Sequence, residues 1–126
     1  MSDDLHLDPD LDDVVQEVNA AQRDIAEVPA VEVILTVAVH LMSAAAVKLG
    51  LGDGPNAADE LDLDEARKLI NALAGLVVTA APDIADVHAR PLRDGLRNLQ
   101  LAFREASPIP DPIGQGPGEK LTGPVN

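Results

Sequence analysis

Residues 30–51, AVEVILTVAVHLMSAAAVKLGL, decide the fold that we expect for this chain. The run has no Gly or Pro before Gly50, so it favours a helix over a strand, although its first half is rich in β-branched residues. Few of its side chains are polar, and they occupy scattered positions: Glu32, Thr36, His40, Ser43 and Lys48. A helix that is apolar on all sides is buried in a protein or in a membrane.

The length of the uncharged run argues against a membrane span. Residues 33–47 would extend about 22 Å at about 1.5 Å per residue, whereas a bilayer core is about 30 Å thick. His40 would also lie in the middle of the bilayer. We therefore expect no membrane span.

Two further helices are expected after this run. Residues 63–80 place apolar side chains every three or four positions, and Asp62 with Glu65 three residues later resembles a capping box. The last helix is expected at residues 91–106, because proline is well tolerated at a first helical position. A short turn at residues 84–89 would precede it. In the alternative, an earlier helical turn from Asp86 continues into this helix and is kinked at Pro91.

The N-terminal region is acidic. Residues 1–9 are expected to be a disordered lead, and residues 10–29 an amphipathic helix that ends at Pro29. Its apolar residues repeat at spacings of three and four over positions 11–28, which is a short heptad seam. Residues 1–32 hold ten acidic side chains and one arginine, a net charge of about −9.

The chain is thus expected to form one small all-α bundle with disordered termini. Its core domain covers residues 30–106 and contains three helices, at 31–51, 63–80 and 91–106. Residues 107–126, SPIPDPIGQGPGEKLTGPVN, are rich in Pro and Gly and are expected to be a disordered tail.

The composition limits the kind of core, the chemistry and the partners that we expect for the protein. Phe103 is the single aromatic residue, so the core must be built from aliphatic side chains. The absence of Cys excludes disulfides and thiolate chemistry. The first residues have no signal-peptide pattern, and we expect a cytoplasmic protein. The formal net charge of −13 opposes binding to phosphate backbones and anionic lipid, so we do not expect nucleic acid as a general partner.

Three motifs resemble a known bacterial family. Residues 30–51 carry His40-Leu41 and end in LGL, residues 62–76 read DLDEARKLINALAGL, and the last helix carries Leu96, Leu99, Leu101 and Phe103. Together, residues 31–106 resemble the small bacterial helical proteins catalogued as a domain of unknown function, number 1844. The chain departs from the family pattern at Pro91 and Gly95. The resemblance implies a compact helical domain and no established activity.

Four arginines of the last helix lie along one stripe: Arg90, Arg93, Arg97 and Arg104. This stripe, the arginine ridge, could face an anion or RNA, as in a nucleic-acid- or ribosome-associated accessory protein. Alternatively, it is a solvated face that pairs with carboxylates of the acidic N-terminal helix. We favour the second interpretation, because no exposed aromatic side chain is available to stack bases.

No pattern for catalysis or for a metal is found. The histidines His6, His40 and His88 lack a second ligand at metal spacing, and the loop at 50–60 has no phosphate-loop spacing. Ser43 and Ser107 have no base in register. We expect no enzyme and no cofactor, and an enzyme or metal-binding domain is the least favoured alternative.

The apolar run at 30–51 therefore suggests the function. Two partner helices cannot cover all of its sides, so we expect a non-enzymatic interaction module that binds a protein partner or a second copy of itself. The candidate interface consists of Val33, Leu41, Ala44, Ala45 and Ala46. In the alternative, the helix at 10–28 covers this surface within one chain.

Overall fold

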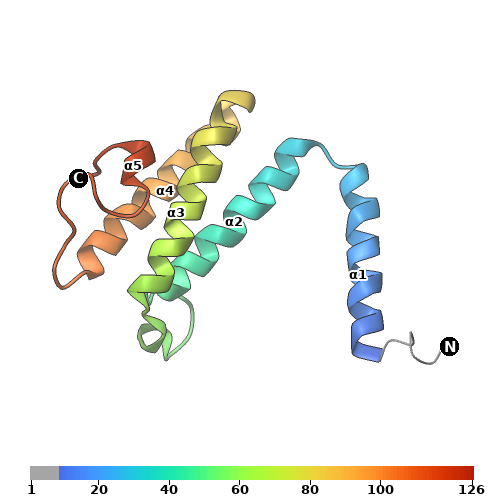
Figure 1. Ribbon diagram of the computed structural model, residues 1–126, viewed down its shortest axis with the longest axis horizontal. Helices are drawn as coiled ribbons and strands as arrows, with labels where there is room; N and C mark the ends of the chain where they lie inside the picture. Colours follow the sequence, from blue (N-terminus) through green and yellow to red (C-terminus); the bar gives the residue numbers. More distant parts are fainter. Residues whose placement is uncertain (1–8) are drawn as a thin grey trace. The chain divides into compact units, whose positions relative to one another are not determined.

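A computed structural model describes residues 9–126 of the chain, with the side chains of 11–19 and 27–126. Every regular element in this range is a helix, as expected from the sequence (Figure 1). The chain divides into two compact units, Met1–Val33 and Ile34–Asn126, and the boundary falls within the second helix.

The first unit contains α1, Pro9–Ala26, which confirms the amphipathic helix expected at 10–28. Leu11, Val14 and Val18 of the heptad seam are all about half exposed. The predicted disordered lead at 1–9 falls almost wholly outside the described residues.

The second unit is a bundle that contains most of α2 (Ala30–Lys48) and all of α3 (Leu63–Ala80) and α4 (Asp86–Ala106). The three helices share one apolar core made of Ala38, Ala45, Leu49, Ala66, Ile70, Leu73, Ala74, Val77, Leu92, Leu96, Leu99 and Phe103. Only small residues of α2 enter this core before Leu49. The aliphatic core and the three-helix arrangement agree with the sequence prediction.

A glycine ends α2 and turns the chain toward α3. Gly50 has a φ of +76°, the Gly50 N–H donates to the carbonyl of Val47, and the Leu51 N–H donates to that of Ala46. These two bonds form a Schellman motif, which satisfies carbonyls that the helix end leaves free. A short 3₁₀ helix, η2 (Ala57–Glu60), follows, and the Asp62 N–H donates to the Lys48 carbonyl, 2.8 Å away.

The start of α3 is capped as predicted. The Asp62 side chain accepts a hydrogen bond from the Glu65 N–H at 3.2 Å. Glu65 also lies 2.7 Å from Lys68, and this hydrogen bond, together with the Glu65 charge, raises the pKa of Lys68. Both side chains of the pair are well exposed, so it adds little to stability.

The start of α4 differs from the prediction. Helix α4 begins at Asp86 and continues through Pro91, after a 3₁₀ turn at η3 (Ala81–Asp83). The extra turn buries Ala89, and it also contains an exposed ion pair between Arg90 and Asp86 at 2.8 Å, which adds little to stability. Pro91 lies only one turn from the helix start, where a missing N–H disturbs few hydrogen bonds.

The predicted disordered tail is the clearest error of the sequence analysis. Residues 107–126 are ordered, include the one-turn helix α5 (Glu119–Thr122), and pack on α3 and α4. Asn71 accepts from the Gly118 N–H, 2.7 Å away, and Gln100 donates to the Pro117 carbonyl and to the Thr122 hydroxyl.

A buried carboxylate holds the tail in its turn. Glu119 accepts from the Gly116 N–H at 2.7 Å and from the Val125 N–H at 2.6 Å. Farther along, Arg67 of α3 donates to both carboxylate oxygens of Asp111, while its guanidinium lies 4.9 Å from the Phe103 ring centre. The segment is fixed by polar contacts that satisfy its backbone, and composition alone does not reveal them.

Candidate functional site

Helix α2 presents one face to the bundle and one face to its surroundings. On the inner face, Ala38, Ala45 and Leu49 are buried. Met42 lies against Gly95 of α4, where an added Cβ would come within 2.7 Å of the methionine methyl group. Ala38 and Ala45 of α2 thus lie in the core, and larger side chains such as Leu41 and Met42 pack against it.

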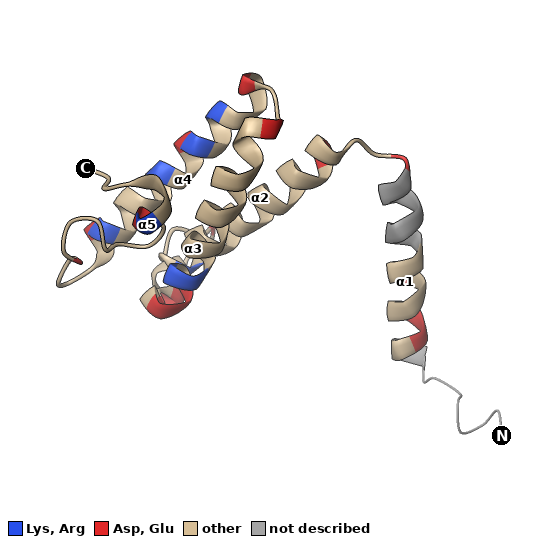
Figure 2. Ribbon diagram, turned by 45° about the horizontal axis from the view of Figure 1, so that its top comes forward, with Lys and Arg blue, Asp and Glu red and all other residues tan. Residues whose placement is uncertain are grey.

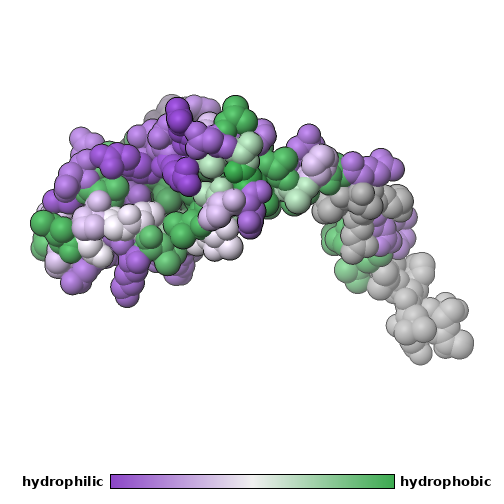
Figure 3. All heavy atoms as spheres, turned by 90° about the horizontal axis from the view of Figure 1, so that it is seen from above, coloured by the Kyte–Doolittle hydropathy of each residue, from purple (hydrophilic) through white to green (hydrophobic). Residues whose placement is uncertain are grey.

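The outer face of α2 is exposed, and its valines are interleaved with the exposed polar side chains of Thr36, His40 and Ser43. The exposed fractions are 45% for Val37, 56% for Val39 and 39% for Val47. Val33 and Ala44 are half-buried beside them, and His40 is exposed. Figure 3 shows apolar surface (green) among the polar side chains of the molecule. This face is the candidate functional site.

The structure divides the five residues predicted for an interface. Ala45 is fully buried in the core, and Leu41 and Ala46 pack against the core. Val33 and Ala44 alone flank the outer face. The exposed valines, Val37, Val39 and Val47, are absent from the predicted set.

A repeat in the sequence could have found the outer face. Val33, Val37, His40, Ala44 and Val47 follow one another at spacings of four, three, four and three. This is a heptad seam, which we call the α2 seam, and heptad spacing is typical of helices that pair with another helix. The small-residue run 44–46 drew attention to the wrong side of the helix.

The outer face offers no obvious catalytic machinery. A shallow hollow on it is lined by Leu35, Thr36, Val39, His40 and Ser43, of which only His40 is titratable. Among the described residues, no three His, Asp or Glu side chains gather in a way that could hold a metal ion.

Helix α2 is also the one described helix long and apolar enough to cross a membrane. Its mean hydropathy reaches 2.0, and little of it is buried. Length and composition alone are weak grounds for a span, since a core helix of a bundle passes the same test.

The arginine ridge is present on α4, along which Figure 2 shows several basic residues in blue. The four arginine side chains have partners. Arg90 and Arg93 lie 2.8 and 3.7 Å from carboxylate oxygens of Asp86. Arg97 donates to the Asn126 carbonyl at 2.8 Å, and Arg104 to the Val125 carbonyl at 3.5 Å. The sequence analysis expected partners on the acidic N-terminal helix and did not predict these partners on α4 and in the C-terminal tail.

A second concave surface lies between α3, α4 and the tail. This open groove of about 400 Å³ has an apolar floor that includes Val77 and Leu96, with Arg93 and Arg97 at its side. Its remaining lining comes partly from Leu121 and Pro124 of the tail. The groove exists only because the tail is ordered.

Packed helices with no strand in residues 9–126 define a small all-α bundle protein. The chain belongs to the family described as a domain of unknown function (DUF1844), which it matches over residues 30–105. The match spans α2, α3 and α4 and confirms the resemblance noted in the sequence. No curated protein and no solved structure matches the chain.

Proposed function

We propose that this chain is a non-enzymatic helical module that self-associates through the outer face of α2. The observation that supports the proposal is the exposure of Val37 and Val47 on a helix that carries no charge between Glu32 and Lys48. Contiguous apolar surface on a folded unit favours association.

The expected driving force is hydrophobic. Covering roughly 300 Å² of apolar surface would supply about 7 kcal/mol before the costs of association are subtracted. The rest of the chain opposes association, because its net charge of −13 makes two copies repel each other. An uncharged helix face is therefore the surface best suited to contact between copies.

The test introduces glutamate at exposed valines on the outer face of α2 and, as a control, at an exposed valine of α4. The double variant Val37→Glu/Val47→Glu places carboxylates on the outer face, whereas Val87→Glu changes a valine of α4 that is 74% exposed. Sedimentation equilibrium should give the 13.2 kDa monomer for the double variant and an oligomer for Val87→Glu. Circular dichroism checks that both remain helical. Equal masses for the two variants would refute the proposal.

Ala45→Glu is not a useful variant for this purpose. Ala45 is fully buried among Leu49 and other core residues, so a carboxylate there would unfold the bundle whether or not the chain associates.

A further inference from the structure

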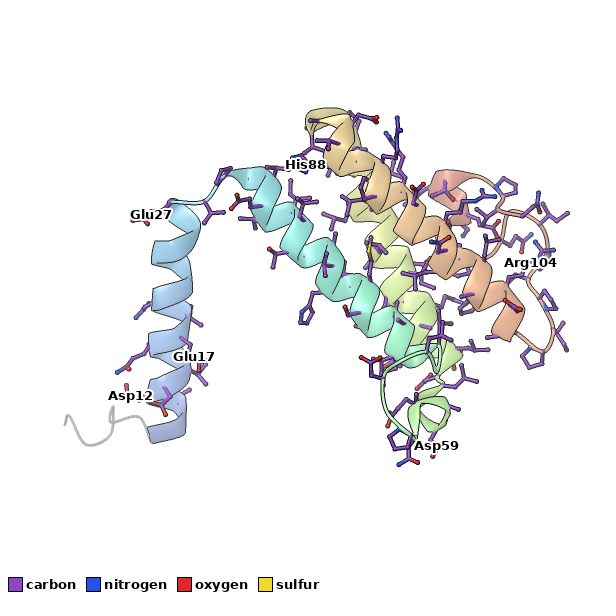
Figure 4. The ribbon with its side chains drawn as sticks, turned by 180° about the vertical axis from the view of Figure 1, so that it is seen from behind. Asp12, Glu17, Glu27, Asp59, His88 and Arg104 are labelled. Carbon is purple, nitrogen blue, oxygen red and sulfur yellow. The ribbon has the colours of Figure 1, made fainter. Side chains whose placement is uncertain are left out.

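We propose that the groove between α3, α4 and the tail binds a single-chain aliphatic anion, such as a fatty acid or an alkyl phosphate. This groove, which we call the tail groove, lies along the part of α4 between His88 and Arg104, which Figure 4 labels near the two ends of that helix. Its lining comes from α3, η3, α4 and the tail and not from α2, so the proposal does not depend on self-association.

The floor of the tail groove is aliphatic. Val77, Leu96 and Val125 are buried there, and they come from α3, α4 and the tail in turn. Val78 and Leu121 also line the groove, and both remain exposed. The volume of about 400 Å³ lies within the range of small-molecule sites, about 300–1,000 Å³. An alkyl chain bound here would remove exposed apolar surface from water, which favours binding.

The uncharged polar side chains of the groove are already hydrogen-bonded within the protein. The Gln100 amide nitrogen donates to the Pro117 carbonyl at 3.0 Å and to the Thr122 hydroxyl at 3.1 Å. That hydroxyl in turn donates to the Gly123 carbonyl at 2.9 Å. A peptide laid on this floor would leave its carbonyl groups without donors, whereas an alkyl chain has no hydrogen bonds to lose. The floor is therefore better suited to an aliphatic chain than to a peptide.

Two arginines supply the charge that attracts an anionic head group. Arg93 and Arg97 both line the groove, and because they are four residues apart on α4 they lie on one face of the helix, one turn from each other. Within the part of the chain that the structure describes, no Asp or Glu lines the groove, although the whole chain carries −13. The tail groove is thus a basic site on an acidic molecule, and it complements a negatively charged ligand.

Both guanidinium groups keep donors for such a ligand. Arg93 lies 3.7 Å from the Asp86 oxygen, which is longer than a hydrogen bond. Arg97 uses one nitrogen to donate to the Asn126 carbonyl at 2.8 Å, and a guanidinium has five N–H donors in all. The two side chains can therefore donate to the same carboxylate or phosphate. Repulsion from the acidic chain opposes an extended polyanion far more than it opposes one such head group.

The test measures binding of octanoate and of octyl phosphate to the full chain by isothermal titration calorimetry. Each ligand is kept below its micelle-forming concentration, and 1-octanol is the uncharged control. We expect saturable binding of at least one anion, and binding of octanol that is at least about tenfold weaker, because the alcohol lacks the charge-assisted hydrogen bonds. The anion that binds more tightly identifies the head group.

A matched pair of variants locates the head group. Arg90 and Arg93 both lie near Asp86, but of these two only Arg93 lines the groove. Arg93→Gln should weaken binding of the anion about three- to fivefold, as expected for the loss of a partly exposed ion pair, whereas Arg90→Gln should bind as the native chain does. Arg97 is left unchanged because it contacts Asn126 of the tail.

A second pair of variants locates the alkyl chain. Val78→Asp places a carboxylate in the groove and should abolish binding, because it repels the ligand and makes the wall polar. Val87→Asp changes an exposed valine of α4 outside the groove and should leave the affinity unchanged. Circular dichroism checks that both variants remain helical.

Three results would overturn the proposal. The first is the absence of saturable binding for both anions. The second is equal affinity for octanol and the anions, which would remove the role of the arginines. The third is equal affinity of Arg93→Gln and Arg90→Gln for the anion, which would place any binding elsewhere on the chain.

Discussion

Gly50 shows at the scale of one residue how the sequence ends the apolar helix. Its φ of +76° lies in the left-handed region, which costs other residues roughly 1–2 kcal/mol. Gly50→Ala should therefore lower the free energy of unfolding by about 1–2 kcal/mol in urea titrations.

Gly75 supplies the matched control, because it lies inside α3 with nothing within 4 Å of an added Cβ. Gly75→Ala should raise stability by about 0.8–1 kcal/mol, since alanine is the better helix former. If both variants changed stability with the same sign, the assignment of Gly50 to the helix-ending motif would be wrong.

Gly118 lies where the tail packs closely against α3 and α4. Its φ is +75°, and an added Cβ would lie 2.8 Å from the Cβ of Ala74 and 2.9 Å from the Gln100 amide nitrogen. Gly118→Ala should loosen residues 107–126 and make Lys120 a faster site of tryptic cleavage.

Gly123 separates the steric effect from the backbone effect in that test. It has a similar φ of +85°, but an added Cβ would meet nothing within 4 Å. Tryptic cleavage at Lys120 should be slower in Gly123→Ala than in Gly118→Ala. Equal cleavage of the two variants would contradict the role given to the contact with Ala74.

At the scale of an element, α4 was predicted in place but one turn too short. Proline at a first helical position is a sound signal, yet the helix start before Pro91 buries Ala89 and pairs Asp86 with Arg90, both of which are exposed. Rules based on local sequence could not compare the contributions of that pair and of Ala89 burial with the cost of the missing N–H of Pro91.

Removing the proline measures that balance. Pro91→Ala restores an N–H that can donate to the Val87 carbonyl, four residues earlier, and Pro91 itself is exposed. Its unfolding free energy should rise by about 1–2 kcal/mol, less than the full helix penalty of proline because the unfolded chain also gains freedom. A loss of stability in thermal or urea unfolding would show that the helix does not continue through residue 91.

The tail and the α2 face show why other elements escaped prediction. The Pro and Gly content of residues 107–126 is typical of disorder. However, Asn71 of α3 and Gln100 of α4 form hydrogen bonds with the tail, and Glu119 forms them within it. The apolar run at 30–51 predicted a helix, and α2 confirms it. Which side of α2 is buried depends on how α3 and α4 pack. The sequence alone therefore placed Ala45 in the interface, although it lies in the core.

At the scale of the whole molecule, the net charge and the contacts of the arginine ridge both oppose binding to a polyanion. The chain carries −13, and all four ridge arginines lie near carboxylate or carbonyl oxygens of Asp86, Val125 or Asn126. We predict no retention on heparin at physiological salt. Retention that disappears in Arg93→Glu/Arg97→Glu would instead support the alternative of a nucleic-acid- or ribosome-associated protein.

The measurement that tests the central claim most directly is the absolute mass of the native chain in solution, by size exclusion with light scattering. Because Tyr and Trp are absent, concentration is read by refractive index. The account predicts a multiple of the 13.2 kDa of one chain, which falls toward 13.2 kDa on sufficient dilution. A mass of 13.2 kDa at every concentration would contradict it, since the outer face of α2 would then have no second copy to cover it.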